Sequence, residues 1–257
     1  MKISVITPSW NQGGFIGQTI QSILEQGIED LEYIVVDGGS KDQTLEILES
    51  YGERIKWVSE ADRGFADAIN KGIGMASGEI IGWLNSDDLY LPGALNRVLD
   101  YFTAHPGCRW LYGRCIIIDR NGKERWRWIT RYKNLSLKRF THNKLLRENF
   151  ISQPAVFFRK DLFQEAGPLD LSLKYAIDYD LWLRFSRIAP AHVIDHDLAA
   201  FRRHGASKSE TGYAKQFREQ YEVAGRYGLS LFSRIVHRFN IFKIVTSYRI
   251  IGLFSRF

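Results

Sequence analysis

Four short apolar segments alternate with three amphipathic segments over the first ninety residues of the chain. The expected strands are 2–7, 31–36, 55–58 and 80–84, and the expected helices include 16–24, 42–51 and 65–76. The segment 31–36 is apolar on both faces, as in a parallel sheet. This alternation predicts an α/β fold with an open, mostly parallel sheet covered by helices. All four strands end in polar loops, and ligands bind at that edge of such sheets.

The rest of the chain alternates less regularly. We expect a helix at 91–105, a hairpin of strands 110–119 and 123–128, a strand at 155–158, helices at 160–166 and 178–188, and a strand at 192–194. The hairpin prediction rests on the turn pair Asn121-Gly122. The polar segment 131–149 is left unassigned. No repeat and no linker rich in proline, glycine or serine divides the chain.

Charge is unevenly distributed along the sequence. The chain has 35 basic and 29 acidic residues, and six basic residues but no acidic ones follow Glu222. Subtracting those six leaves 29 basic against 29 acidic residues, so the main body is neutral. A protein that binds nucleic acid through its body would need a basic patch there, which disfavours that class.

The remaining composition favours an intracellular protein. The first residues are interrupted too soon for a signal peptide, and we expect no membrane span because no run of about 18 apolar residues occurs. Cys108 and Cys115 lack metal-ligand spacing and are expected to be reduced thiols in a cytoplasmic protein.

The most informative loop follows the fourth strand, where Asp87 and Asp88 are adjacent. Neighbouring carboxylates at the end of a buried strand repel each other and favour a positive partner. Mg²⁺ or Mn²⁺ fits, because these ions accept carboxylate, phosphate and water ligands. The alternative is a solvated turn in which one of the two residues caps the next helix.

The loop after the first strand lacks the glycine pattern of a dinucleotide site, and the P-loop pattern is also absent from the sequence. Trp10 could stack on a base and Asn11 could hydrogen-bond to it, unless Trp10 is ordinary packing. Asp37 could accept a hydrogen bond from uracil N3 or from a ribose hydroxyl, or it could cap the helix near Asp42.

Three further sets of polar residues are candidates. Asp67, Asn70 and Lys71 share one face of a helix, where they could meet hydroxyls and a diphosphate or form an intrahelical ion pair. Asp178 opens a helix and could be a general base, although Asp at a helix start is favourable by itself. His204 and Lys208 could reach a pyrophosphate or a metal, or they could be surface residues.

Five motifs then follow one another in order over roughly residues 2–210. They are 7–11 (Thr-Pro-Ser-Trp-Asn), 35–44 (Val-Val-Asp-Gly-Gly-Ser-Lys-Asp-Gln-Thr), 59–64 (Ser-Glu-Ala-Asp-Arg-Gly) with 67–72 (Asp-Ala-Ile-Asn-Lys-Gly), 85–88 (Asn-Ser-Asp-Asp) and 178–184 (Asp-Tyr-Asp-Leu-Trp-Leu-Arg). Together they resemble the family 2 glycosyltransferases of the GT-A fold.

The resemblance implies an inverting transferase that uses a nucleotide-diphosphate sugar, most often a UDP-sugar, with Mn²⁺ or Mg²⁺. It implies a GT-A domain over 1–225, with a nucleotide-sugar-binding half at 1–105 and an acceptor-binding half at 106–225. The expected metal ligands are Asp87 and Asp88, and the expected base is Asp178, with Asp180 as the substitute. The implied nucleotide- and sugar-binding residues are Thr7, Pro8, Trp10, Asn11, Asp37, Gly39, Asp62, Gly64, Asp67, Asn70, Lys71, Asn85, Ser86, Asp87, His204 and Lys208.

Three positions depart from the family pattern. Gly38 stands where many relatives have a second Asp, Asn85 stands where the first acid of a D-x-D triplet often lies, and Ile177 replaces a frequent Glu. The departures at Asn85 and Ile177 keep open a second function class, a non-catalytic sugar-nucleotide-binding or scaffold protein with the same fold.

The tail at 226–257 mixes arginines with aromatic and branched residues. An amphipathic basic helix of this kind fits the surface of an anionic membrane. Alternatively, its apolar face packs on the protein's own body or on a second subunit as a homodimer. On the membrane hypothesis, the enzyme is peripheral and acts on a lipid-linked or growing saccharide in the synthesis of cell-surface polysaccharide or glycan.

Overall fold

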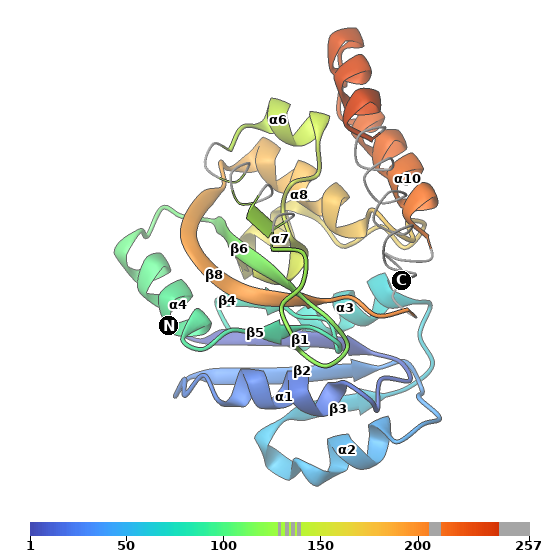
Figure 1. Ribbon diagram of the computed structural model, residues 1–257. Helices are drawn as coiled ribbons and strands as arrows, with labels where there is room; N and C mark the ends of the chain where they lie inside the picture. Colours follow the sequence, from blue (N-terminus) through green and yellow to red (C-terminus); the bar gives the residue numbers. More distant parts are fainter. Residues whose placement is uncertain (128–129, 132–133, 135–136, 138–139, 206–211, 242–257) are drawn as a thin grey trace.

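The computed structural model describes residues 1–127, 130–131, 134, 137, 140–205 and 212–241. Its sheet has eight strands in the order β3-β2-β1-β4-β7-β6-β8-β5 (Figure 1). The strands are β1 (Ile3–Ser9), β2 (Leu31–Asp37), β3 (Lys56–Ser59), β4 (Ile80–Trp83), β5 (Leu89–Tyr90), β6 (Trp110–Ile118), β7 (Val156–Arg159) and β8 (His192–Arg202). β1 to β4 pair in parallel, β7 is antiparallel to β4 and β6, and β5 is antiparallel to β8.

Helices cover both faces of this sheet. They are α1 (Ile16–Leu24), α2 (Thr44–Ser50), α3 (Phe65–Met75), α4 (Ala94–Ala104), α6 (His142–Arg147), α7 (Lys160–Ala166), α8 (Ile177–Ile188) and α10 (Tyr213–Arg226), with 3-10 turns η1 (Gly52–Arg54) and η2 (Gln153–Ala155). Successive strand residues point to opposite faces, so Val5 and Ile6 enter two separate apolar clusters. α1, α2 and α4 cover the Val5 face, and α3, α6, α7, α8 and α10 cover the Ile6 face.

The predicted alternation of the first half is confirmed, with small changes at the ends of elements. The helix expected from 91 begins at Ala94, because Gly93 adopts a left-handed backbone (φ 74°). In α1, residues Ile16, Ile20 and Ile23 form the buried stripe expected of a helix with one apolar face.

The second half differs from the prediction in two places. The prediction of a strand at 123–128 is wrong for residues 123–127, because Glu124 makes only an isolated bridge to Ile118 and Arg127 is helical. Residue 128 lies outside the described residues. β8 runs for eleven residues, whereas only 192–194 were expected. The strand was missed because Asp195 and Asp197 interrupt its apolar sequence. In the structure both carboxylates form ion pairs with Arg114 of β6, each at 3.0 Å.

Glu32 anchors the end of the sheet opposite the polar loops. Its buried carboxylate accepts hydrogen bonds from Ser4 Oγ (2.6 Å), Lys56 Nζ (2.8 Å) and Ser77 N (2.7 Å). Burial alone would raise the pKa of Glu32, but the hydrogen bonds from Lys56, Ser4 and Ser77 outweigh it and lower the pKa to about 2. The ionised carboxylate therefore stabilises the folded state.

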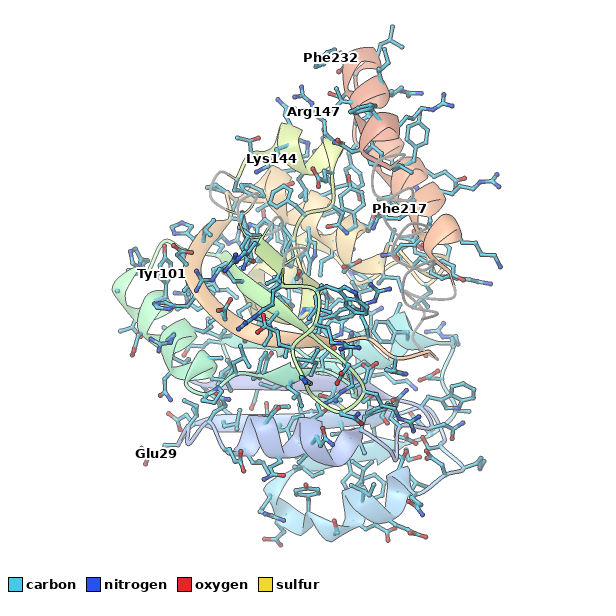
Figure 2. All side chains as sticks on the ribbon, viewed as in Figure 1. Glu29, Tyr101, Lys144, Arg147, Phe217 and Phe232 are labelled. Atoms are coloured by element: carbon cyan, nitrogen blue, oxygen red, sulfur yellow. The ribbon has the colours of Figure 1, made fainter. Side chains whose placement is uncertain are left out.

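We expect Glu32→Gln to lower the free energy of unfolding at pH 7 by up to about 3 kcal/mol. Because the folded pKa is depressed, the wild type holds this advantage above the ordinary glutamate pKa and loses it as the pH falls toward 2. Urea unfolding at pH 7 and at pH 3 measures the difference between the proteins. The exposed Glu29 (Figure 2) provides the control Glu29→Gln. If the difference in unfolding free energy between wild type and Glu32→Gln is as large at pH 3 as at pH 7, the lowered pKa of Glu32 is contradicted.

Candidate active site

Four loops meet at one edge of the sheet because β1, β2, β3 and β4 run in parallel (Figure 1). The register places Ser9 beside Asp37, and Asp37 beside Ser59. The loops that follow β1, β2 and β3 are therefore neighbours, and the loop after β4 extends from the other side of β1. This arrangement is the edge at which the sequence predicted a ligand site.

Asp37 organises the first two loops from inside. Its carboxylate is fully buried and accepts hydrogen bonds from Gly39 N (3.0 Å), Ser40 N (2.8 Å) and Ser59 Oγ (2.7 Å). Gly39 has the left-handed φ of 82° that lets the chain close around this carboxylate. Asp37 therefore shapes the loop, and its contact with a base or ribose stays a prediction.

Two backbone hydrogen bonds lock the first loop to the second. Asn11 N donates to Ser40 Oγ (2.7 Å), and Lys41 N donates to Asn11 Oδ1 (2.8 Å). Thr7 and Pro8 are buried below this loop, and their contact with the nucleotide stays a prediction. Trp10 is left 65% exposed at the rim. An exposed indole can stack on a ring. The alternative, in which Trp10 packs in the interior, does not hold in the structure.

Gly38, one of the departures from the family pattern, has a structural reason. A Cβ atom at this position would lie 2.8 Å from Asp62 Oδ2, so the carboxylate of Asp62 occupies the space of a side chain. Asp62 also accepts a hydrogen bond from Gly64 N (2.8 Å), which shapes the turn into α3. Asp62 thus supplies a carboxylate beside the loop where residue 38 lacks one.

Most polar residues on this face of α3 form contacts within the protein. Asp67 binds Arg63 Nη2 at 2.8 Å, and this hydrogen bond holds the pKa of Asp67 below its ordinary value. Lys71 lies 2.9 Å from Glu60 and 3.9 Å from Asp67, and Glu60 raises the pKa of Lys71. The ion-pair alternative thus holds for both residues, although Lys71 remains a cation beside the loops.

Asn70 belongs to the same helix face but has a different partner. Its amide donates to Leu169 O (3.1 Å) and accepts from Leu169 N (2.9 Å). Both ends of the amide thus hold the segment that leads toward α8, and the contact of Asn70 with a sugar hydroxyl stays a prediction.

Asn85 and Ser86 build the loop after β4. The indole of Trp83 donates to Asn85 Oδ1 (3.1 Å), and Thr19 Oγ1 lies 2.9 Å from Ser86 O. Ser86 is only 5% exposed. Both predicted ligand residues therefore hold the loop in shape.

The adjacent carboxylates of this loop differ sharply in environment. Asp88 is fully buried and accepts hydrogen bonds from Arg202 N (2.8 Å) and Asn85 Nδ2 (3.1 Å). Burial, reinforced by the charge of Asp87, raises the pKa of Asp88 well above its usual range. Asp87 instead lies 3.0 Å from His204 Nε2, with part of its side chain exposed. Direct metal binding by Asp88 stays a prediction, and Asp87 with His204 forms the more exposed pair at this site.

His204 is held on two sides. Besides Asp87, its ring packs on Phe15 with centroids 4.6 Å apart. Across the described residues, no cluster of three His, Cys, Asp or Glu side chains could enclose a metal ion. A carboxylate and an imidazole are nevertheless suitable donors for Mn²⁺ or Mg²⁺ when phosphate oxygens and water complete the shell. Lys208, the predicted companion of His204, lies outside the described residues.

Arg202 was not among the predicted site residues, yet its side chain connects three parts of the site. Its fully buried guanidinium donates to Asp87 O (2.7 Å), Arg120 O (2.8 Å) and Gln18 Oε1 (2.8 Å). One side chain thus joins the loop after β4, the turn after β6 and α1. The sequence showed only two adjacent arginines before His204, and nothing local distinguishes the buried one.

The start of α8 carries the predicted base. Asp178 is partly exposed and accepts a hydrogen bond from Tyr179 N (2.8 Å). Asp180 is 4% exposed and binds Arg184 Nε (3.0 Å) and Tyr227 Oη (2.6 Å). The carboxylate of Asp180 thus holds α8 to the end of α10, and its role as substitute base stays a prediction.

The fold and its loop edge define a GT-A-type sheet, as predicted, and comparisons with known proteins agree. Solved structures with this fold include TarS 1–349 of S. aureus in complex with UDP-GlcNAc, with a TM-score of 0.70 and 21% identity over 87% of this chain and 64% of that chain. Another is the mannosyltransferase PcManGT from Pyrobaculum calidifontis with GDP-Man and Mn²⁺, with a TM-score of 0.68 and 16% identity over 98% of this chain and 80% of that chain.

Sequence relatives identify the family. The family described as glycosyl transferase family 2 matches residues 4–167. An uncharacterized glycosyltransferase of Rickettsia typhi is 32% identical over 86% of this chain and 69% of its own length. A PGL/p-HBAD biosynthesis glycosyltransferase of Mycobacterium bovis is 29% identical over 96% of both chains. The chain belongs to glycosyl transferase family 2 and is a glycosyltransferase.

Proposed function

We propose that this enzyme moves a sugar from a nucleotide-diphosphate sugar, most simply a UDP-sugar, to a hydroxyl group of a saccharide or lipid-linked acceptor. The observation that carries the proposal is the Asp87–His204 pair, 3.0 Å apart, on the loop edge of a family 2 fold. The TarS complex with UDP-GlcNAc supports the choice of donor class. Residues 1–105 would hold the donor, and residues 106–225 would hold the acceptor.

The nucleotide would lie across the first two loops. The exposed indole of Trp10 offers a stacking surface for the base, and Asn11 lies beside it. Asp37 and Gly39 would act by fixing the loop, with Asp62 and Gly64 at its border. Lys71, a cation whose pKa is raised by Glu60, would neutralise part of the diphosphate charge.

The chemistry would be a single displacement. The acceptor oxygen forms a bond to the anomeric carbon while the bond from that carbon to the diphosphate oxygen breaks, and its electron pair leaves with the nucleotide diphosphate. Asp178 takes the proton of the acceptor hydroxyl as the oxygen attacks. Attack from the face opposite the leaving group inverts the anomeric configuration.

Asp87 and His204 fit a divalent cation, Mn²⁺ or Mg²⁺. Such an ion, when bound, supplies positive charge that stabilises the departing diphosphate. Arg202 and Asp88 would keep Asp87 and His204 in place, since Arg202 binds the backbone of Asp87 and the carboxylate of Asp88.

Donor binding tests this proposal. We expect one of UDP-GlcNAc, UDP-glucose, dTDP-glucose or GDP-mannose to bind in a manner that depends on Mn²⁺, measured by calorimetry with and without the ion. Asp87→Asn is expected to weaken binding by about 10- to 100-fold, because it removes the charge from a metal ligand. Asp100→Asn, an exposed change on α4, is the control. Failure of all four donors to bind would instead favour a scaffold protein.

We further propose that the enzyme works at a membrane surface. Within the described ranges, every helix is too short or too polar to cross a bilayer. The helical segment 231–241 nevertheless leaves Leu231, Phe232 and Ile235 exposed by 78%, 64% and 62%, and Arg234 and Arg238 on the same segment are also exposed. Exposed apolar residues flanked by arginines suit an anionic lipid surface.

The opposite face of this segment is already occupied by the protein. His237 is buried and its Nδ1 lies 2.8 Å from Leu146 O, and the buried Ser233 accepts a hydrogen bond from Arg147 Nε of α6 (3.1 Å). Arg147 also lies 5.3 Å from the ring of Phe232, at the border between this buried face and the exposed one (Figure 2). In the described part of the tail, the face that packs on the body is thus not the exposed apolar one. The predicted tail beyond residue 241 lies outside the described residues.

Co-sedimentation with vesicles tests the membrane proposal. The double variant Phe232→Ser/Ile235→Ser is expected to lose most of its binding to phosphatidylglycerol vesicles, whereas neither protein binds phosphatidylcholine vesicles. The double variant Met75→Ser/Leu171→Ser removes exposed apolar residues elsewhere and should bind like wild type. Equal binding by the two double variants would reject the proposal.

A further inference from the structure

A carboxylate from another helix holds the chain just before the predicted base. Glu219 of α10 accepts hydrogen bonds from the backbone N–H groups of Lys174 (3.1 Å), Tyr175 (2.6 Å) and Ala176 (2.6 Å). Three successive backbone N–H groups that all donate to one carboxylate form a strong anion-binding nest. Ala176, the N-cap residue of α8, has no side chain that could cap the helix, so the capping charge comes from α10.

Two further contacts from the end of α10 hold the same segment. Arg226 binds Asp170 at 3.0 Å, and the Tyr227 hydroxyl donates to Asp180 (2.6 Å). The three contacts lie before and after Asp178 in the sequence, so they restrain the backbone on both sides of it. Val223 and Ala224 on α10 are fully buried in the same apolar cluster as α8, which fixes the distance between the two helices.

We infer that Glu219 is a positioning residue for Asp178, and that α10 is thereby part of the catalytic apparatus. Both α8 and α10 lie beyond residues 4–167, the part of the chain that matches the family. The inference rests on the proposed role of Asp178 as the base. Asp178 follows Ala176 by two residues, so the place of its carboxylate depends on the segment that Glu219 holds. Proton removal is sensitive to such placement, because a shift of about 1 Å can lower a rate by about 100-fold.

The test compares three variants of the full chain. Turnover is the release of UDP from the bound UDP-sugar, in which water takes the place of the acceptor. Glu219→Ala is expected to lower turnover by about 10- to 100-fold with the donor Kd unchanged within about twofold. Glu219→Gln keeps an acceptor oxygen and should recover part of the rate. Glu222→Ala removes a carboxylate from the same helix, which pairs with the exposed Arg218 at 3.2 Å, and should match wild type.

Wild-type turnover in Glu219→Ala would overturn the inference, as would a fall in turnover matched by an equal loss of donor affinity. If Glu219→Ala does not fold, the same measurements on Glu219→Gln test the inference. Reduced turnover with an unchanged donor Kd supports it, and wild-type turnover overturns it. Asp178→Asn separates this inference from the proposed function. Full turnover in Asp178→Asn means that the base is misassigned. An inactive Asp178→Asn beside a fully active Glu219→Ala means that only the role of Glu219 fails.

Discussion

Asp178→Asn is expected to lower turnover by about 10²- to 10⁴-fold and to leave donor affinity unchanged. Asparagine has nearly the shape of aspartate and can keep the hydrogen bond from Tyr179 N, but it cannot accept the proton of the acceptor hydroxyl. The loss should therefore appear in the rate of the chemical step alone. UDP release under saturating donor, together with donor binding by calorimetry, measures the two effects separately.

Asp180→Asn is the matched comparison on the same helix. Because Asp180 binds Arg184 and Tyr227, this change should lower thermal stability while the folded enzyme keeps most of its turnover. The reverse outcome, an active Asp178→Asn and an inactive but stable Asp180→Asn, would assign the base to Asp180.

Arg202→Met is expected to lower the free energy of unfolding by about 3 kcal/mol. Methionine keeps an apolar side chain but removes the guanidinium, whose carbon lies 5.3 Å from the Phe15 ring. Buried acceptors on Asp87, Arg120 and Gln18 are then left without their donor. It also removes the positive charge near the buried carboxylate of Asp88. Urea unfolding measures the change. Donor binding should weaken as well, because Asp87 loses its support.

The control for Arg202→Met is Arg114→Met. Arg114 lies on β6, is 30% exposed and forms ion pairs at the surface with Asp195 and Asp197. Surface pairs of this kind contribute about 1 kcal/mol or less, so the unfolding midpoint should move only slightly. Equal destabilisation by the two substitutions would show that Arg202 has no special role in the site.

The first half of the fold was predictable because its signals are local. Residues such as Ile16, Ile20 and Ile23 repeat with the period of a helix, and each of the first four strands is a short apolar run that ends in a polar loop. The order of these elements and the rule that parallel strands share a carboxyl edge then place the loops together. The prediction of a hairpin after Ile118 was wrong because an Asn-Gly turn can form without a second paired strand after it.

The sequence by itself determined the α/β class, the loop edge and the family, because these depend on periodicity and on motifs within a few residues of one another. Only the tertiary structure decided that Asp87 is available whereas Asp88 is buried, that Arg202 supports both, and that Glu219 holds the start of α8. Arg202 contacts Asp88 across 114 positions of the chain, and His204 contacts Asp87 across 117. Burial and hydrogen bonding set the role of each polar residue here, and both arise from parts of the chain that are distant in sequence.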